Sequence, residues 1–185
     1  PTHLRRVLEA RLESAGADVV RALQAVAVLG SLPLAVLEEV LGPDGAPGVD
    51  QAERTGWLAV DPGARARTRP AHPLYAEAAL GTLAARERRD LITRVASAVV
   101  DDPGSSATER LQATAALVDV GASVALPALV EAARTAFAAL DHEQAVRLAM
   151  VAVTAGDPFE AHLVAGAAHS GAGRPDEAEA ALRVA

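Results

Sequence analysis

Residues 57–69, Trp57-Leu-Ala-Val-Asp-Pro-Gly-Ala-Arg-Ala-Arg-Thr-Arg69, mark the point where the apolar pattern changes from helical spacing to short strand-like runs. The runs 57–60 and 65–69 flank Asp61-Pro-Gly-Ala64, and a Pro-Gly pair between two such runs is typical of a tight turn. We therefore expect a two-stranded hairpin here, within a chain whose other patterns are helical.

Short helical segments precede this hairpin. Apolar residues at helical spacing predict helices over residues 3–14, 18–29, 34–41 and 49–55. Pro33 is expected at the first position of the third helix, and residues 42–48 are expected to form a loop. Further helices are predicted from Pro73 to about Leu83 and from Arg86 to Val100. Short helices followed by a hairpin are the order of a winged helix-turn-helix, so the sequence predicts a winged-helix-like module.

A winged helix raises the question of DNA binding. The recognition helix would be residues 48–55, which carry two acidic residues and one arginine, a weak set for phosphates or base edges. The arginines instead lie in the predicted hairpin, at Arg65, Arg67 and Arg69. Either they form a solvated strand face or they contact another domain or a nucleotide phosphate. We expect no direct nucleic acid binding by this chain.

The composition bounds the fold class and excludes several functions. Of 185 residues, 51% are hydrophobic and 45 are alanine, the best helix former, so a mostly α-helical protein is expected. The absence of cysteine excludes a disulfide scaffold and thiol catalysis and fits a cytoplasmic protein. The absence of lysine excludes a phosphate-binding loop within the chain. No stretch of about 18 uninterrupted apolar residues is present, so no membrane contact is expected.

The charge distribution points to two modules. Residues 1–100 hold equal numbers of arginines and acidic residues, so the net charge of −7 belongs wholly to residues 101–185. The change falls at Asp101-Asp-Pro-Gly-Ser-Ser106, a cluster typical of a turn or linker. We therefore expect domains over residues 1–102 and 103–185.

The second module contains an internal repeat. Ser106-x-x-Glu109 is a capping box that predicts a helix start. Ala145 and Ala152 align with Ala178 and Ala185 at an offset of 33. The repeated small residues resemble those of the tetratricopeptide repeat, where paired helices cross closely. These packing positions are Ala133, Ala145, Ala152, Gly166, Ala178 and Ala185.

The histidines of this module are expected to be structural. His162 and His169 stand where the tetratricopeptide family has Trp and Tyr, so we expect core packing and no metal site, since a metal needs about three convergent ligands. Asp141-His142-Glu143 is expected to be a solvated turn at a helix start. No arrangement typical of a catalytic site is present, so we do not expect an enzyme.

A second resemblance concerns residues 71–96. Ala71-His-Pro-Leu-Tyr-Ala-Glu-Ala78, followed by Leu83, Arg88-Arg89 and Leu91-x-x-Arg-Val-Ala96, resembles the end of the winged-helix module in large ATP-binding LuxR-family regulators related to the maltose-regulon activator. The resemblance implies a regulatory middle region between an ATPase domain and a DNA-binding domain, with ATP or ADP bound by the parent protein and not by this chain. It also implies an inducer or protein partner on the repeats.

Two readings of the chain as a whole follow. It lacks an initiating Met and ends inside a helical pattern, so we expect a piece of such a regulator. The alternative is a free-standing helical-repeat adaptor or scaffold whose winged helix binds proteins.

His72 is the residue for which the LuxR resemblance implies a role. In related signal-transduction ATPases a histidine at the matching place touches the phosphates of the bound nucleotide. The alternative is that His72 caps the helix that Pro73 opens. From the sequence both remain open.

Overall fold

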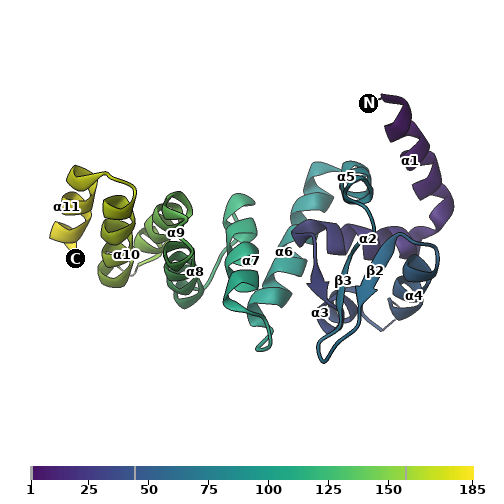
Figure 1. Ribbon diagram of the computed structural model, residues 1–185, viewed down its shortest axis with the longest axis horizontal. Helices are drawn as coiled ribbons and strands as arrows, with labels where there is room; N and C mark the ends of the chain where they lie inside the picture. Colours follow the sequence, from purple (N-terminus) through teal and green to yellow (C-terminus); the bar gives the residue numbers. More distant parts are fainter. Residues whose placement is uncertain (1, 44, 157) are drawn as a thin grey trace. The chain divides into compact units, whose positions relative to one another are not determined.

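The structure is a computed structural model that describes residues 2–43, 45–156 and 158–185 (Figure 1). Within these residues the chain has eleven helices and three short strands, which confirms the predicted mostly α-helical class. It divides into two compact units, Pro1–Asp102 and Pro103–Ala185, called here the first and the second unit. None of the described helices is long and apolar enough to cross a membrane.

The first unit begins with four helices, α1 (Thr2–Ala15), α2 (Ala17–Leu29), α3 (Leu34–Leu41) and α4 (Ala46–Arg54). The first three have the predicted bounds to within a residue or so. The prediction of a loop over residues 42–48 was wrong at its end, because α4 starts at Ala46 with Pro47 in its first turn. The close approach of α4 to α2 requires glycine at position 48, because a Cβ there would lie 2.8 Å from the Cβ and 2.9 Å from the backbone oxygen of Asp18.

The sheet has three strands instead of the predicted two. The hairpin consists of β2 (Leu58–Asp61) and β3 (Arg67–Pro70), and β1 (Leu32–Pro33) pairs antiparallel with β3 on its other side. Pro33 therefore lies in β1 and at the N-cap of α3, not at its first helical position. The buried hydroxyl of Thr68 donates a hydrogen bond to the carbonyl of Leu32 at 3.1 Å and reinforces this pairing. A strand of two residues shows no alternation, so the sequence pattern could not reveal it.

The core of the first unit surrounds α2. This helix contacts α1, α3 and α4 as well as the two later helices, α5 (Pro73–Gly81) and α6 (Ala85–Asp101). Six consecutive residues of α2, from Ala22 to Ala27, are buried, as expected for a helix covered on all sides. Large side chains fill this core and are at most 2% exposed: Leu12, Leu23, Leu32, Leu37, Leu58, Val26, Val95 and Val99.

The second unit is a row of helices, α7 (Ala107–Asp119), α8 (Leu126–Ala138), α9 (His142–Ala155), α10 (Pro158–Gly171) and α11 (Pro175–Val184). Each helix packs on the next one in the chain, and α7 and α8 also reach the next but one (Figure 1, green to yellow). The predicted capping box opens α7, with the Ser106 hydroxyl accepting from the Glu109 amide at 3.2 Å and the Glu109 carboxylate accepting from the Ser106 amide at 2.7 Å.

The core of the second unit is built mainly of alanine. The buried alanines are Ala113, Ala132, Ala133, Ala136, Ala145, Ala149, Ala152, Ala161, Ala165, Ala168 and Ala178, with Leu129 and Leu148 as the largest side chains that are almost fully buried. Because alanine projects only a methyl group, the helices can approach one another closely along the whole row.

Candidate functional site

His72 lies at the junction of β3 and α5. Its backbone is extended, and its Nδ1 accepts a hydrogen bond at 3.2 Å from the amide of Leu74 in the first turn of α5. The helix-capping contact is thus present. The imidazole is exposed. Since Nδ1 is the acceptor, this geometry assigns the ring proton to Nε2, which is then a hydrogen-bond donor available to a ligand.

A line of stacked side chains supports His72. Its ring centroid lies 5.8 Å from that of Tyr75, and Tyr75 lies 4.7 Å from Trp57. The guanidinium of Arg11, on α1, lies over the Trp57 ring at 5.1 Å. The Trp57 carbonyl also accepts a hydrogen bond at 2.9 Å from the amide of Ala71. The backbone before His72 and the ring beside it are therefore fixed to the same buried tryptophan. Sequence reasoning did not find this stack, because its members share no local motif.

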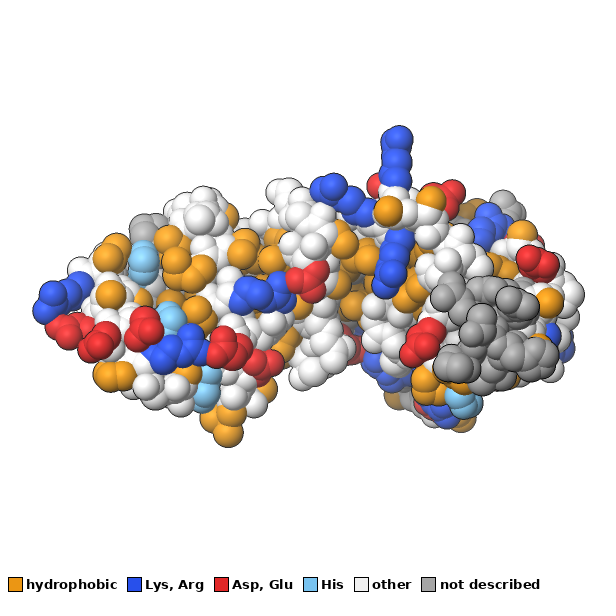
Figure 2. Space-filling view, turned by 90° about the horizontal axis from the view of Figure 1, so that it is seen from above, with side chains coloured by type: hydrophobic (Ala, Val, Ile, Leu, Met, Phe, Trp, Pro, Cys, Tyr) orange, Lys and Arg blue, Asp and Glu red, His pale blue; other side chains and the backbone are white. Residues whose placement is uncertain are grey.

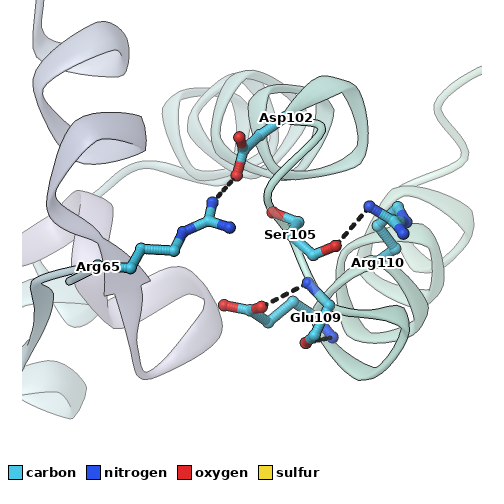
Figure 3. A network of polar contacts seen from close by, with 6 residues as sticks. Arg65, Asp102, Ser105, Glu109 and Arg110 are labelled. Carbon is cyan, nitrogen blue, oxygen red and sulfur yellow. Dashed lines mark hydrogen bonds and ion pairs between the residues drawn. The ribbon is translucent and has the colours of Figure 1, made fainter. Parts of the chain in front are cut away.

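The three arginines of the hairpin each have a different partner. Arg65 forms an ion pair with Asp102 at the end of α6 (Figure 3). Arg67 donates to the hydroxyl of Ser31 at 3.2 Å, and the Nε of Arg69 lies 3.2 Å from a carboxylate oxygen of Asp61. Arg65 and Arg67 are half-buried and Arg69 is exposed. They therefore do not form one cationic cluster, although Arg69 keeps much of its surface open to solvent.

The predicted packing positions of the second unit lie at helix contacts, except one. Ala133, Ala145 and Ala152 are fully buried, and Ala178 is 6% exposed. Gly166 is buried on α10, where an added Cβ would lie 2.6 Å from Leu182 Cγ and 3.3 Å from the Ala178 carbonyl of α11. Ala185 follows α11 and is exposed. Small residues are thus required where α10 and α11 cross.

The histidines of the second unit pack inside it. His162 is 9% exposed and His169 is half-buried. The prediction of a solvated turn was wrong for His142, whose ring packs 5.7 Å from the Phe137 ring and against Gly171. Gly171 makes the space, because a Cβ there would lie 2.5 Å from the His142 ring. Among the described residues, no group of three or more His, Cys, Asp or Glu side chains could hold a metal ion.

Every arginine of the second unit is paired with a carboxylate. Four of these pairs join different helices or a helix and a neighbouring turn, and basic and acidic side chains lie side by side on the face seen in Figure 2. The pairs are Arg110–Glu131, Arg134–Glu160, Arg147–Asp119, Arg174–Glu143 and, within α11, Arg183–Glu179. Arg110 also donates to the carbonyl of Ser105 (Figure 3). The second unit therefore offers a polyanion no unpaired arginine.

Comparisons of the chain with protein-family models, with curated proteins and with solved structures found no match.

Proposed function

We propose that this chain is the regulatory middle region of a cytoplasmic LuxR-family regulator. In this proposal the first unit is a winged-helix-like module and the second a tetratricopeptide-like array. Together they couple the nucleotide bound by an adjacent ATPase domain, and an effector or partner on the repeats, to a DNA-binding domain of the same polypeptide. The observation that carries the proposal is that the His-Pro-Leu segment of the resemblance forms an exposed, firmly supported helix start at His72.

The geometry of His72 suits a phosphate contact. With Nδ1 engaged by the Leu74 amide, Nε2–H is the donor that would meet a phosphate oxygen. A single hydrogen bond from a fixed ring breaks when the domains on its two sides rotate apart, which is what a switch requires. Arg69, exposed on the adjacent strand, is the hairpin arginine most open to the same phosphates.

The second unit suits a role in binding a partner and not in catalysis. A closely packed row of helices presents continuous faces on which a partner can bind. The buried positions Ala133, Ala145, Ala152, Gly166 and Ala178 support the tetratricopeptide-like assignment. Because its arginines are already paired with carboxylates, an effector or partner on this unit is expected to be uncharged or basic.

The test compares two substitutions of His72 in the full-length parent. Asn is a good N-cap and keeps the capping bond, whereas Ala loses it. We expect His72→Asn and His72→Ala both to weaken ADP retention by about tenfold or more, since a hydrogen bond to a charged group is lost, and to raise basal transcription. If His72→Asn retains ADP like the wild type, the nucleotide role is refuted and capping remains.

Gene context distinguishes the proposed regulator from the alternative function, a free-standing adaptor. An upstream phosphate-binding loop and a downstream helix-turn-helix in the same reading frame would support the regulator. A reading frame with neither would favour the adaptor and overturn the proposal.

DNA binding by the isolated chain gives a further check. At physiological salt we expect no measurable affinity, because the chain has a net charge of −7 and residues 48–55, the expected recognition helix, carry only one arginine. Tight, salt-sensitive binding would contradict the assignment of this chain as the middle of the regulator.

A further inference from the structure

The first unit contains a cleft that the proposed function does not use. It encloses about 510 Å³ between α2, the end of α3, the turn before α6, and α6 itself. This volume falls within the range of pockets that hold small molecules, and it is too small for a folded partner.

The cleft has an apolar wall and a polar floor. Val40, Leu41, Leu83 and Leu91 form the wall. The floor includes Gln24, only 9% exposed, whose side-chain amide donates to the Thr82 hydroxyl at 3.0 Å and is held by it. The cleft can therefore hold an apolar body against its wall and a polar group on its floor.

The charges that line the cleft are nearly all engaged. Asp18 is ion-paired with Arg21, Glu87 accepts a hydrogen bond from the Ala84 amide at 3.0 Å, and Asp90 lies 3.9 Å from the Nε of Arg86.

The exception is Arg94 of α6, an exposed residue that makes no hydrogen bond or ion pair within the described part of the chain. Glu87, Leu91 and Arg94 follow helical spacing, so they face the cleft from one side of α6. Of the two cations that line the cleft, Arg21 is paired with Asp18, so Arg94 is the one without a carboxylate partner in the described part of the chain. Glu87 keeps its negative charge, because its partner is a neutral amide. The planar fork of the Arg94 guanidinium matches a carboxylate.

We propose that this cleft binds a small amphipathic carboxylate, with its acid group on Arg94 and its apolar body against Leu83 and Leu91. The site is an effector site in the first unit, separate from the nucleotide contact at His72 and from any partner on the repeats. This proposal can be tested independently of the proposed function, because its test needs neither nucleotide nor DNA.

The test is calorimetric titration of the 185-residue chain with 4-phenylbutyrate, which has about a dozen non-hydrogen atoms and fits such a pocket. For a ligand of this size we expect one saturable site with a Kd of roughly 1 mM. The matched probes 4-phenylbutanamide and 4-phenylbutylamine have the same apolar body without the negative charge. We expect both to bind about tenfold more weakly. No saturable binding of the acid, or tighter binding of the amine, would overturn the proposal.

Three variants locate the site. Arg94→Gln is expected to weaken 4-phenylbutyrate binding about tenfold, whereas Arg88→Gln, an exposed arginine of the same helix outside the cleft, is expected to leave it unchanged. Leu83→Ala is expected to weaken the acid and the amide alike, because it removes apolar contact and no charge. An equal loss from Arg88→Gln and Arg94→Gln would show general charge attraction and refute the site.

Discussion

In the first unit the side chains that are excluded from solvent are mostly leucines and valines, whereas in the second unit they are mostly alanines. In the first unit large side chains fill space between elements that cross at varied angles and include a sheet. In the second, helices that follow one another in the chain approach closely enough that a methyl group fills the contact. The difference predicts that truncation is the most costly change among the leucines and valines of the first unit, and enlargement the most costly change among the buried alanines of the second.

The largest expected effect is a truncation in the first unit. Leu37→Ala removes a fully buried side chain and leaves a cavity, so we expect a loss of about 2–5 kcal/mol in the free energy of unfolding. Urea unfolding followed by the fluorescence of Trp57, the only tryptophan of the chain, measures it within the first unit. The exposed neighbour Glu38→Ala is the control, with a change within about 0.5 kcal/mol. A loss for Leu37→Ala as small as that would contradict a tightly filled core.

The next effect is an enlargement in the second unit. Ala149 is fully buried between helices. Ala149→Leu forces side chains or helices to shift, which costs about 1–3 kcal/mol. Helical circular dichroism during urea unfolding is the measurement. Ala180→Leu on the exposed side of α11 is the matched control and is expected to be near neutral. If both leucines were tolerated equally, the close helix approach described for this unit would be wrong.

Two helical glycines mark a limit of this comparison, because here the contact that cannot relax lies in the first unit. A Cβ on Gly48 meets the backbone of Asp18 at 2.9 Å, which cannot move without shifting α2, so Gly48→Ala should destabilise by about 1–2 kcal/mol. A Cβ on Gly166 meets mainly the side chain of Leu182, which is 48% exposed and can turn away. The helix propensity gained by Gly166→Ala, about 1 kcal/mol, is expected to offset that clash. Thermal unfolding of both variants checks the order, and a larger loss at Gly166 would show that Leu182 cannot turn away.

The smallest effect is a stabilisation at the turn between α8 and α9. Leu140 has a φ of 63°, the left-handed region that favours Gly and Asn, and it is 76% exposed. Replacing it should cost no packing, so Leu140→Asn is expected to raise the free energy of unfolding by about 1 kcal/mol or less. Ala139→Asn, whose φ is −82°, is the control and should not stabilise. Equal effects of the two would mean that the left-handed turn carries no strain.

Local signals explain which elements were predictable. The helix over residues 34–41 and the turn at 61–64 follow from apolar spacing and from Pro-Gly, which act over a few residues. The strand at Leu32 depends on Thr68, far along the chain, and the start of α4 depends on the absence of a Cβ at Gly48 beside Asp18. Neither the pairing with Thr68 nor the close approach at Gly48 can be predicted from the residues next to the strand or the helix.

The candidate sites also differ in how far the sequence predicts them, according to whether the contacts are local or distant in the chain. Capping by His72 could be predicted because Pro73 and Leu74 are its immediate neighbours. The partners of Arg65 and Arg67 could not, since Asp102 and Ser31 come from distant segments. The cleft at Arg94 was missed for the same reason: its lining comes mainly from α2, α3, α6 and the turn before α6, and no single one of these segments shows a ligand-binding motif.

The alanine core of the second unit also has a consequence for the speed and entropy of folding. Alanine has no side-chain rotamers to lose, so burying Ala133, Ala145 or Ala165 costs almost no side-chain entropy, whereas each leucine buried in the first unit costs about 0.5–1 kcal/mol. The contacts of the second unit also join helices adjacent in the chain, while β3 of the first unit must find β1 across three intervening elements. Low contact order favours rapid folding. The second unit is therefore expected to fold first after dilution from denaturant, although it follows the first unit in the chain.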